Sequence, residues 1–257
     1  MKICGQNFVS ISPDQITAVI LVGGFGTRIK HLLGDLPKPM APVNGKPFLE
    51  WLVRWLAAQN IHRVVLSTGY RAEVIEEYFR PQPVKGVTVT CVPETTPLGT
   101  AGGFLNAVQQ SKIKSAAWLL VNGDTLAFAN LSDAVRQLQN EATAGVIFGR
   151  EVPDTSRYGS LVSDADGRLA SFAEKRPGHG VISTGVYLFR DTLVKKFYSK
   201  VPLSLEQEVF PALVSAGESL QVIRINTPFL DIGTPATLGE ADLFIQQNLH
   251  QFQIESV

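Results

Sequence analysis

An apolar run over residues 18–22 leads without a break into the glycine-rich segment Gly23-Gly24-Phe25-Gly26. A short apolar run that ends in closely spaced glycines is typical of a buried strand followed by a tight turn. In open α/β sheets, ligands bind at this end of a strand. The start of the chain therefore predicts an α/β fold with a ligand site directly after its first strand.

The rest of the first half alternates apolar runs with helical patterns, which indicates a parallel sheet with crossover helices. In the segment 47–58, Leu49, Leu52 and Trp55 fall near one face of a helix that Pro47 can open. The strands expected after the first are 64–67, 87–92 and 118–121, and the helices are 47–58, 72–79 and 101–110.

After Asn140 the apolar runs lie closer together, which indicates a mixed and partly antiparallel arrangement. Ser204, with Gln207 three residues later, forms a capping box for a helix expected to end near Gly217. Pro235 opens a last helix toward residue 247. The strands expected here are 144–148, 160–163, 169–172 and 181–189, with a hairpin turn at 164–167.

The composition narrows the class of protein. The 257 residues are 45% hydrophobic and carry no formal net charge, so a large core is possible, and we expect neither nucleic acid nor a membrane as a partner. Cys4 and Cys91 are widely separated, without metal-ligand spacing, which suits a reducing compartment. No apolar stretch approaches the length of a membrane span, so we expect a cytoplasmic protein.

Two cations follow the glycine-rich loop. Arg28 can bind phosphate oxygens through its forked guanidinium, and Lys38 supplies a compact charge on a backbone stiffened by Pro37 and Pro39. The glycines let backbone N–H groups approach phosphate oxygens. Together these features predict a loop that binds a triphosphate.

A glycine-rich loop of this kind has three other possible interpretations. A dinucleotide-binding turn needs a third glycine where Ile29 stands, and an ordinary P-loop needs Gly-Lys-Ser/Thr where Thr27-Arg28 stands. The third interpretation is a tight turn without a ligand. The cations at 28 and 38 favour the phosphate-binding loop.

The loop and the Pro-Lys-Pro run resemble the G-G-x-G-T-R and P-K-P motifs of the sugar-1-phosphate nucleotidyltransferase family. The likeness covers residues 16–245, with three further motifs in the family's order: Asn122-Gly123-Asp124, Glu174-Lys175 and Asp231-Ile232-Gly233-Thr234-Pro235. It implies a Rossmann-like α/β fold of the nucleotide-diphospho-sugar transferase type, a three-layer sandwich with a mixed, mostly parallel sheet.

This resemblance also implies a domain organisation and a reaction. We expect an extension over 1–15 and one domain over 16–257, with a nucleotide-binding half at 16–140 and a sugar-phosphate half at 141–257. In the implied reaction, which depends on Mg²⁺, a sugar 1-phosphate attacks the α-phosphorus of a nucleoside triphosphate and pyrophosphate leaves. The attacking oxygen is already ionised near neutral pH, so alignment and charge stabilisation are needed rather than a general base.

Each residue that matches a family motif takes an expected role. The nucleotide is expected to be held by Gly23, Gly24, Gly26, Thr27, Glu94, Gly99 and Thr100. The expected catalytic residues are Arg28, Lys38, Asp124, Lys175 and Asp231, of which Asp124 and Asp231 are the magnesium ligands. The sugar phosphate is expected to contact Tyr158, Gly159, Glu174, Lys175, Ser183, Thr184 and Gly185.

Glu94 lies in the loop that reads the base in this family. A carboxylate can accept hydrogen bonds from guanine N1–H and N2–H₂, whereas uracil and thymine present one donor between two acceptors. The residue therefore favours GTP. Some uridylyl-transferring relatives also place an acid near this position, so a uridylyl- or thymidylyltransferase stays an alternative.

Several segments are similar to one branch of the family, the D-glycero-α-D-manno-heptose 1-phosphate guanylyltransferases: 36–43, 157–159, 204–206 and 229–235. No hexapeptide repeat follows, which favours this short type and a role in nucleotide-sugar synthesis for cell-surface polysaccharide. Ser183 stands where the family has Asn, so the sugar stays open, with mannose 1-phosphate as an alternative. A homodimer and, in another class, a non-catalytic regulatory subunit are also considered.

Overall fold

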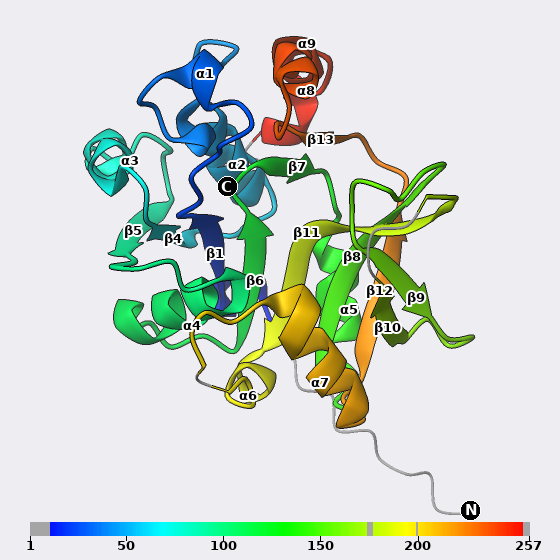
Figure 1. Cartoon of the computed structure of the whole chain (residues 1–257). Coiled ribbons are helices and arrows are strands. Elements are labelled where there is room, and N and C mark those ends of the chain that lie inside the picture. Colours follow the sequence, from blue (N-terminus) through cyan, green and yellow to red (C-terminus); the bar gives the residue numbers. More distant parts are fainter. Residues whose placement is uncertain (1–10, 174–176, 199, 254–257) are drawn as a thin grey trace, which may run out of the picture.

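The computed structural model describes residues 11–173, 177–198 and 200–253. Its centre is a nine-stranded sheet with the strand order β10-β9-β11-β6-β1-β4-β5, in which β8 pairs with β11 and β12 (Figure 1). The strands of the first half are β1 (Ile16–Val22), β4 (Arg63–Thr68), β5 (Thr88–Pro93) and β6 (Ala117–Asn122). Those of the second half are β8 (Gly145–Val152), β9 (Ser160–Ser163), β10 (Leu169–Ala173), β11 (Gly180–Arg190) and β12 (Leu220–Ile225).

The direction of pairing changes at β6. β1 is parallel to β4 and to β6, and β4 is parallel to β5. β11 then runs antiparallel to β6, β8 and β9. The sheet is therefore mixed, as predicted, and its parallel run of four neighbouring strands lies in the first half, where helices long enough to cross over separate the strands in sequence.

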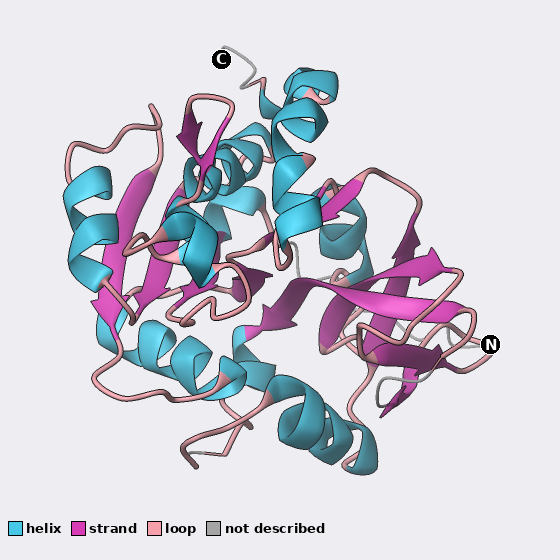
Figure 2. Cartoon of the chain, turned by 45° about the horizontal axis from the view of Figure 1, so that its top comes forward, coloured by secondary structure: helices cyan, strands magenta, loops and turns pink. Residues whose placement is uncertain are grey.

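Helices cover both faces of the sheet, as Figure 2 shows. α2 (Phe48–Ala58), α3 (Ala72–Phe79) and α5 (Leu131–Gln137) share one core with the side chains of Ala18 and Ile20. α4 (Thr100–Ser111), α6 (Asp191–Val194) and α7 (Phe210–Ser215) share the other core with Val19. Because successive side chains of a strand point to opposite faces, β1 supplies both cores, and the predicted three layers are confirmed.

Two small sheets lie outside the main one. β2 (Pro42–Val43) pairs with β3 (Lys46–Pro47), and β7 (Thr125–Ala127) pairs with β13 (Phe229–Asp231). The second pair sets Asp231 opposite Thr125, although the two residues are far apart in sequence. The remaining helices are α1 (Lys30–Leu33), α8 (Pro235–Gly239) and α9 (Ala241–Gln247), with short turns at Pro13–Gln15, Lys38–Met40 and Leu249–Phe252 and a π-helical turn at Leu205–Val209.

Two helix predictions need correction. The helix expected from Pro235 toward residue 247 is broken at Glu240 into α8 and α9, next to Gly239, a residue that weakens helices. Ser204 does accept a hydrogen bond from the backbone N–H of Gln207, but its own N–H donates to the carboxylate of Glu208 rather than to Gln207. The wider π turn brings the later residue into reach.

Part of the predicted N-terminal extension packs onto the domain. Ile11 is buried, and the guanidinium of Arg63 donates to the Asp14 carbonyl at 2.6 Å. These contacts attach residues 11–15 to the start of β4. Among the residues that the structure describes, the helices all fall short of the length and apolarity that a membrane span requires.

Candidate functional site

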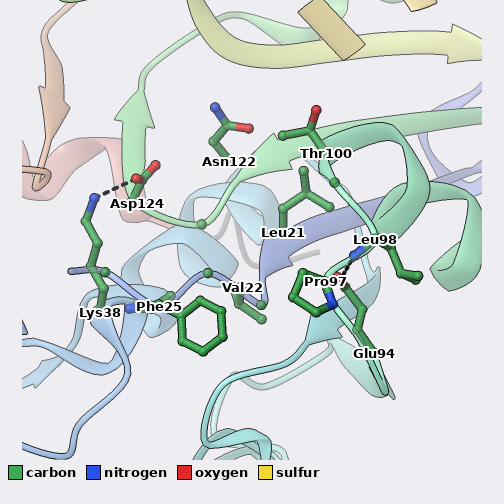
Figure 3. Close-up of a pocket in the computed structure, with 16 residues that line it drawn as sticks. Leu21, Val22, Phe25, Lys38, Glu94, Pro97, Leu98, Thr100, Asn122 and Asp124 are labelled. Carbon is green, nitrogen blue, oxygen red and sulfur yellow. Dashed lines mark hydrogen bonds and ion pairs between the residues drawn. The ribbon is translucent and has the colours of Figure 1, made fainter. Parts of the chain in front are cut away.

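A cavity of about 420 Å³ opens at the carboxyl ends of β1 and β6. Lys38 and Asp124 lie at one end of it and Glu94 at the other (Figure 3). All of the residues that line it come from the first half of the chain: Leu21–Gly26, Lys38, Pro39, Glu94, Pro97–Thr100 and Asn122–Asp124. The predicted ligand site after the first strand is thus a cavity of the size that small-molecule sites have.

Close backbone contacts shape the glycine-rich loop. Gly26 has a φ of +58°, and a Cβ there would lie 2.8 Å from the Lys38 Cβ, so only glycine lets Lys38 pack beside the loop. At Gly69, which follows β4, a Cβ would lie 2.8 Å from the Gly23 Cα. Gly123 donates from its N–H to the Leu21 carbonyl at 3.0 Å. The ends of β1, β4 and β6 are therefore held together around the cavity.

Lys38 joins the two acidic residues predicted as metal ligands. Its Nζ lies 2.6 Å from Asp124 Oδ2 and 3.9 Å from Asp231 Oδ1, and its side chain is only 13% exposed. Asp124 follows β6 and precedes β7, while Asp231 ends β13, so the β7–β13 pairing brings the two carboxylates together. A backbone hydrogen bond also connects the two segments, because the Ile232 N–H donates to the Asp124 carbonyl.

Hydrogen bonds fix the orientation of both carboxylates. Asp231 accepts from the Gly233 N–H at 2.7 Å and from the Tyr158 hydroxyl at 3.4 Å. Asp124 accepts from the Thr125 hydroxyl at 3.0 Å. Burial raises the pKa of Tyr158, and the charge of Asp231 raises it further, so this hydroxyl stays protonated and can donate.

Glu94 is held from both sides at the far end of the cavity. The Ser67 hydroxyl donates to its Oε1 at 2.8 Å, and the Leu98 N–H donates to its Oε2 at 3.3 Å. A Cβ at Gly103 would lie 2.5 Å from Oε1, so the glycine at this position makes room for the carboxylate. With four acceptor positions on a carboxylate, two remain for a ligand.

The start of α4 is attached to the second half of the chain. Ala101 and Gly102 donate their N–H groups to the Leu203 carbonyl at 3.0 and 3.2 Å. The Thr100 hydroxyl accepts from the Leu205 N–H at 2.9 Å and donates to Glu206 at 3.2 Å. Two of the first N–H groups of this helix are thus satisfied by a protein carbonyl rather than directed at a ligand.

A second cavity, of about 810 Å³, adjoins the first. Asn122 lines both, and every other residue that lines the second comes from the later half: Arg157, Tyr158, Gly159, Phe172, Ser183, Gly185, Tyr187, Ser204, Glu206, Gln207 and Pro211. Gly185 has a φ of +74°, and a Cβ there would lie 2.5 Å from Asn122 Nδ2. The glycine therefore allows β11 to approach the residue shared by the two cavities.

Ser183 and Tyr187 form a polar pair in the second cavity. Their hydroxyl oxygens lie 2.8 Å apart, and the N–H of Gly185 donates to Ser183 Oγ at 3.3 Å. Burial raises the pKa of Tyr187 far above its usual range, and the charge of Glu206 adds to the shift. The tyrosine is therefore neutral and serves as a hydrogen-bonding group.

Most of the predicted nucleotide and sugar residues line the two cavities, but some do not. The prediction that Thr184 contacts the sugar phosphate needs correction for its side chain. This side chain is buried, and its hydroxyl donates to the Phe148 carbonyl, so it faces away from the second cavity. Thr27 and Arg28 are exposed and lie outside the residues that line the first cavity. Glu174 and Lys175 lie outside the described residues.

Other residues at the site were not singled out from the sequence. Ser67 and Gly69 support Glu94 and the loop, and Phe172 fills the space that Gly159 leaves, since a Cβ there would lie 2.2 Å from the ring. Glu206 lies within the segment 204–206 that resembles one branch of the family, yet the resemblance gave no reason to assign a role to it, and Tyr187 was not singled out at all. Only the fold shows that they face a cavity.

Comparisons with known proteins identify relatives along nearly the whole chain. Residues 17–248 match the family model described as Nucleotidyl transferase. A mannose-1-phosphate guanylyltransferase of Mycobacterium tuberculosis is 34% identical over 91% of this chain, which spans 66% of that protein's length. A D-glycero-alpha-D-manno-heptose 1-phosphate guanylyltransferase of Campylobacter jejuni is 34% identical over 85% of this chain and 95% of its own.

A solved structure shows the same architecture. The crystal structure of HddC from Yersinia pseudotuberculosis complexed with GMP-PN has a TM-score of 0.75 and 33% sequence identity to this chain. The match covers 88% of this chain and 98% of that one.

Proposed function

Because the chain belongs to the nucleotidyl transferase family, we propose that it transfers the guanylyl group of GTP to a sugar 1-phosphate and releases pyrophosphate. The observation that carries the proposal is a pair of cavities that share Asn122, with Lys38 and two carboxylates beside the first. The nucleotide would occupy the cavity of the 16–140 half, and the sugar 1-phosphate that of the 141–257 half. The reacting phosphates would then meet at their junction.

In this arrangement a phosphate oxygen of the sugar 1-phosphate attacks the α-phosphorus, and the bond to the β-phosphate oxygen breaks. The approaching anions repel each other by about 4 kcal/mol per unit pair at 4 Å and an effective dielectric constant of 20. Lys38 at the first cavity and Arg157 at the second would each offset part of this repulsion. The residues supply alignment and charge, which is what phosphoryl-type transfer requires.

The chemistry of the Asp124–Asp231 pair fits Mg²⁺. Both carboxylates already contact one cation, the Lys38 ammonium, and they stand beside a cavity of suitable size for a triphosphate. Mg²⁺ binds through one or two protein carboxylates together with substrate phosphates, and bound there it would neutralise phosphate charge. The described part of the chain holds no cluster of three or more acidic, His or Cys side chains that could bind a metal ion. Chelation with EDTA should abolish transfer, and added Mg²⁺ should restore it.

Glu94 supports guanine as the base. Its carboxylate is oriented by Ser67 and Leu98 and keeps two acceptor positions, which match the adjacent N1–H and N2–H₂ donors of guanine. Relatives of both sugar types are named as guanylyltransferases. The same carboxylate disfavours uracil and thymine, which would direct carbonyl oxygens toward it.

We propose D-glycero-α-D-manno-heptose 1-phosphate as the sugar substrate and mannose 1-phosphate as the second candidate. The two sugars have the same ring configuration, and relatives at 34% identity are named for each. A non-catalytic regulatory role is less well supported, since Lys38, Asp124 and Asp231 are all present and assembled.

Pyrophosphate release tests the proposal. The purified chain is supplied with GTP, UTP, dTTP, CTP or ATP, and with each sugar 1-phosphate in turn. We expect kcat/KM to be highest for GTP with the heptose 1-phosphate. Higher kcat/KM with mannose 1-phosphate would favour the second candidate, and a preference for UTP or dTTP would overturn the assignment of the base.

A further inference from the structure

Glu206 lies at the wall of the second cavity, on the π-helical turn that connects the two halves of the site. Its Oε2 accepts hydrogen bonds from the hydroxyls of Thr100 and Ser204, both at 3.2 Å. Each of these hydroxyls itself accepts from a backbone N–H, of Leu205 and Gln207 respectively, which leaves its own proton free to point at Glu206. Two donors fixed in this way hold the carboxylate in one orientation.

The other oxygen of this carboxylate has a different environment. No residue that the structure describes donates a hydrogen bond to Glu206 Oε1, although the side chain lines a cavity of about 810 Å³. A carboxylate oxygen fixed at the wall of a cavity is a strong acceptor for a hydroxyl group. It would also repel phosphate, and would therefore orient a sugar phosphate with its hydroxyls toward Glu206 and its phosphate away from it.

We infer that Glu206 is a specificity-determining residue that accepts a hydrogen bond from a ring hydroxyl of the sugar 1-phosphate. This inference rests on the proposed function. Thr100 is the positioning residue that holds Glu206 there. Thr100 lines the first cavity, and its hydroxyl also reaches the wall of the second cavity through Glu206. The same contact connects the nucleotide loop to the sugar cavity.

Binding of D-mannose 1-phosphate and its 2-, 3-, 4- and 6-deoxy analogues, measured by titration calorimetry, tests this inference without requiring turnover. In the wild type, one deoxy analogue should bind roughly 10- to 100-fold more weakly than the parent, as expected for loss of a hydrogen bond to a charged acceptor. Glu206→Gln should weaken binding of the parent sugar by a similar factor and reduce the penalty for that one analogue to about threefold or less. Thr100→Val should show the same pattern with a smaller loss.

Glu208→Gln is the matched control. Glu208 lies on the same turn, but its carboxylate accepts from the Ser204 N–H and from Lys200, and it does not line the cavity. This variant should keep the wild-type pattern of binding. If Glu206→Gln binds all five sugars with wild-type affinity, or if the wild type does not discriminate among them, the inference is wrong. Discrimination that depends on Glu206, without any guanylyl transfer by the wild type, would instead refute the proposed function alone.

Discussion

Replacing Glu94 with Gln changes the hydrogen-bonding pattern of the base site with little change in shape. In the wild type, the Ser67 hydroxyl donates to Glu94 Oε1 and lies 3.0 Å from the Gly103 carbonyl oxygen. In the variant, this hydroxyl can donate to the Gly103 carbonyl and accept a hydrogen bond from the new amide group. The Gln carbonyl then keeps the bond from the Leu98 N–H. The variant is accommodated, but it presents an acceptor and a donor to guanine in place of two acceptors.

The expected magnitude follows from the loss of one hydrogen bond to a charged acceptor, which contributes about 1.5–3 kcal/mol. The kcat/KM for GTP should therefore fall roughly 10- to 150-fold. The kcat/KM for dTTP or UTP should rise, since an amide can pair with both N3–H and a carbonyl of these bases. Initial rates of pyrophosphate release with each nucleotide, and a thermal unfolding midpoint as a check on folding, measure both effects. An unchanged kcat/KM for GTP in the folded variant would refute the role of Glu94.

Three further predictions test other parts of the site and fold. Asp124→Asn should lower kcat roughly 100-fold or more while leaving the thermal midpoint near that of the wild type, and retained kcat would exclude a catalytic role for this carboxylate. Gly103→Ala should raise the KM for GTP roughly tenfold, because the added Cβ would lie 2.5 Å from Glu94 Oε1. Gly239→Ala is the control and should leave this KM unchanged, because its added Cβ would have no atom within 4 Å. Burial and the Glu50 carboxylate raise the pKa of Tyr78 to about 12, so its contribution to the free energy of unfolding should be constant below about pH 10 and be lost toward pH 12. Tyr158 and Tyr187, whose pKa values burial also raises, add to the same decline, so Tyr78→Phe should make it shallower in urea titrations without removing it. An identical decline in the variant would contradict the assignment.

The regular parts of the fold were predictable because their local patterns agree with their environment. β1, β4 and β6 are short apolar runs buried on both faces, and α2 is an apolar helix that is buried along nearly its whole length. The glycine-rich loop lines the first cavity, at the strand end where a ligand site was predicted. In each case, the residues near in sequence determine the structure.

The connections between distant segments were not predictable. β7 and β13 have three residues each, too few for a period to be recognised, and their pairing alone brings Asp231 to Asp124. Thr184 shares a motif with Ser183, but the alternation of β11 turns its side chain into the core. The contact of Thr100 with Glu206 depends on how the π-helical turn meets α4, which no local pattern encodes.

Isotope transfer tests the proposed reaction most directly. The heptose 1-phosphate, labelled with ¹⁸O in the non-bridging oxygens of its phosphate, is incubated with GTP, Mg²⁺ and the protein, and the products are analysed by mass spectrometry. If a sugar-phosphate oxygen attacks the α-phosphorus, all of the label appears in the GDP-sugar and the pyrophosphate is unlabelled. Label in the pyrophosphate, or GTP consumption without a labelled nucleotide-sugar, would contradict the proposed reaction.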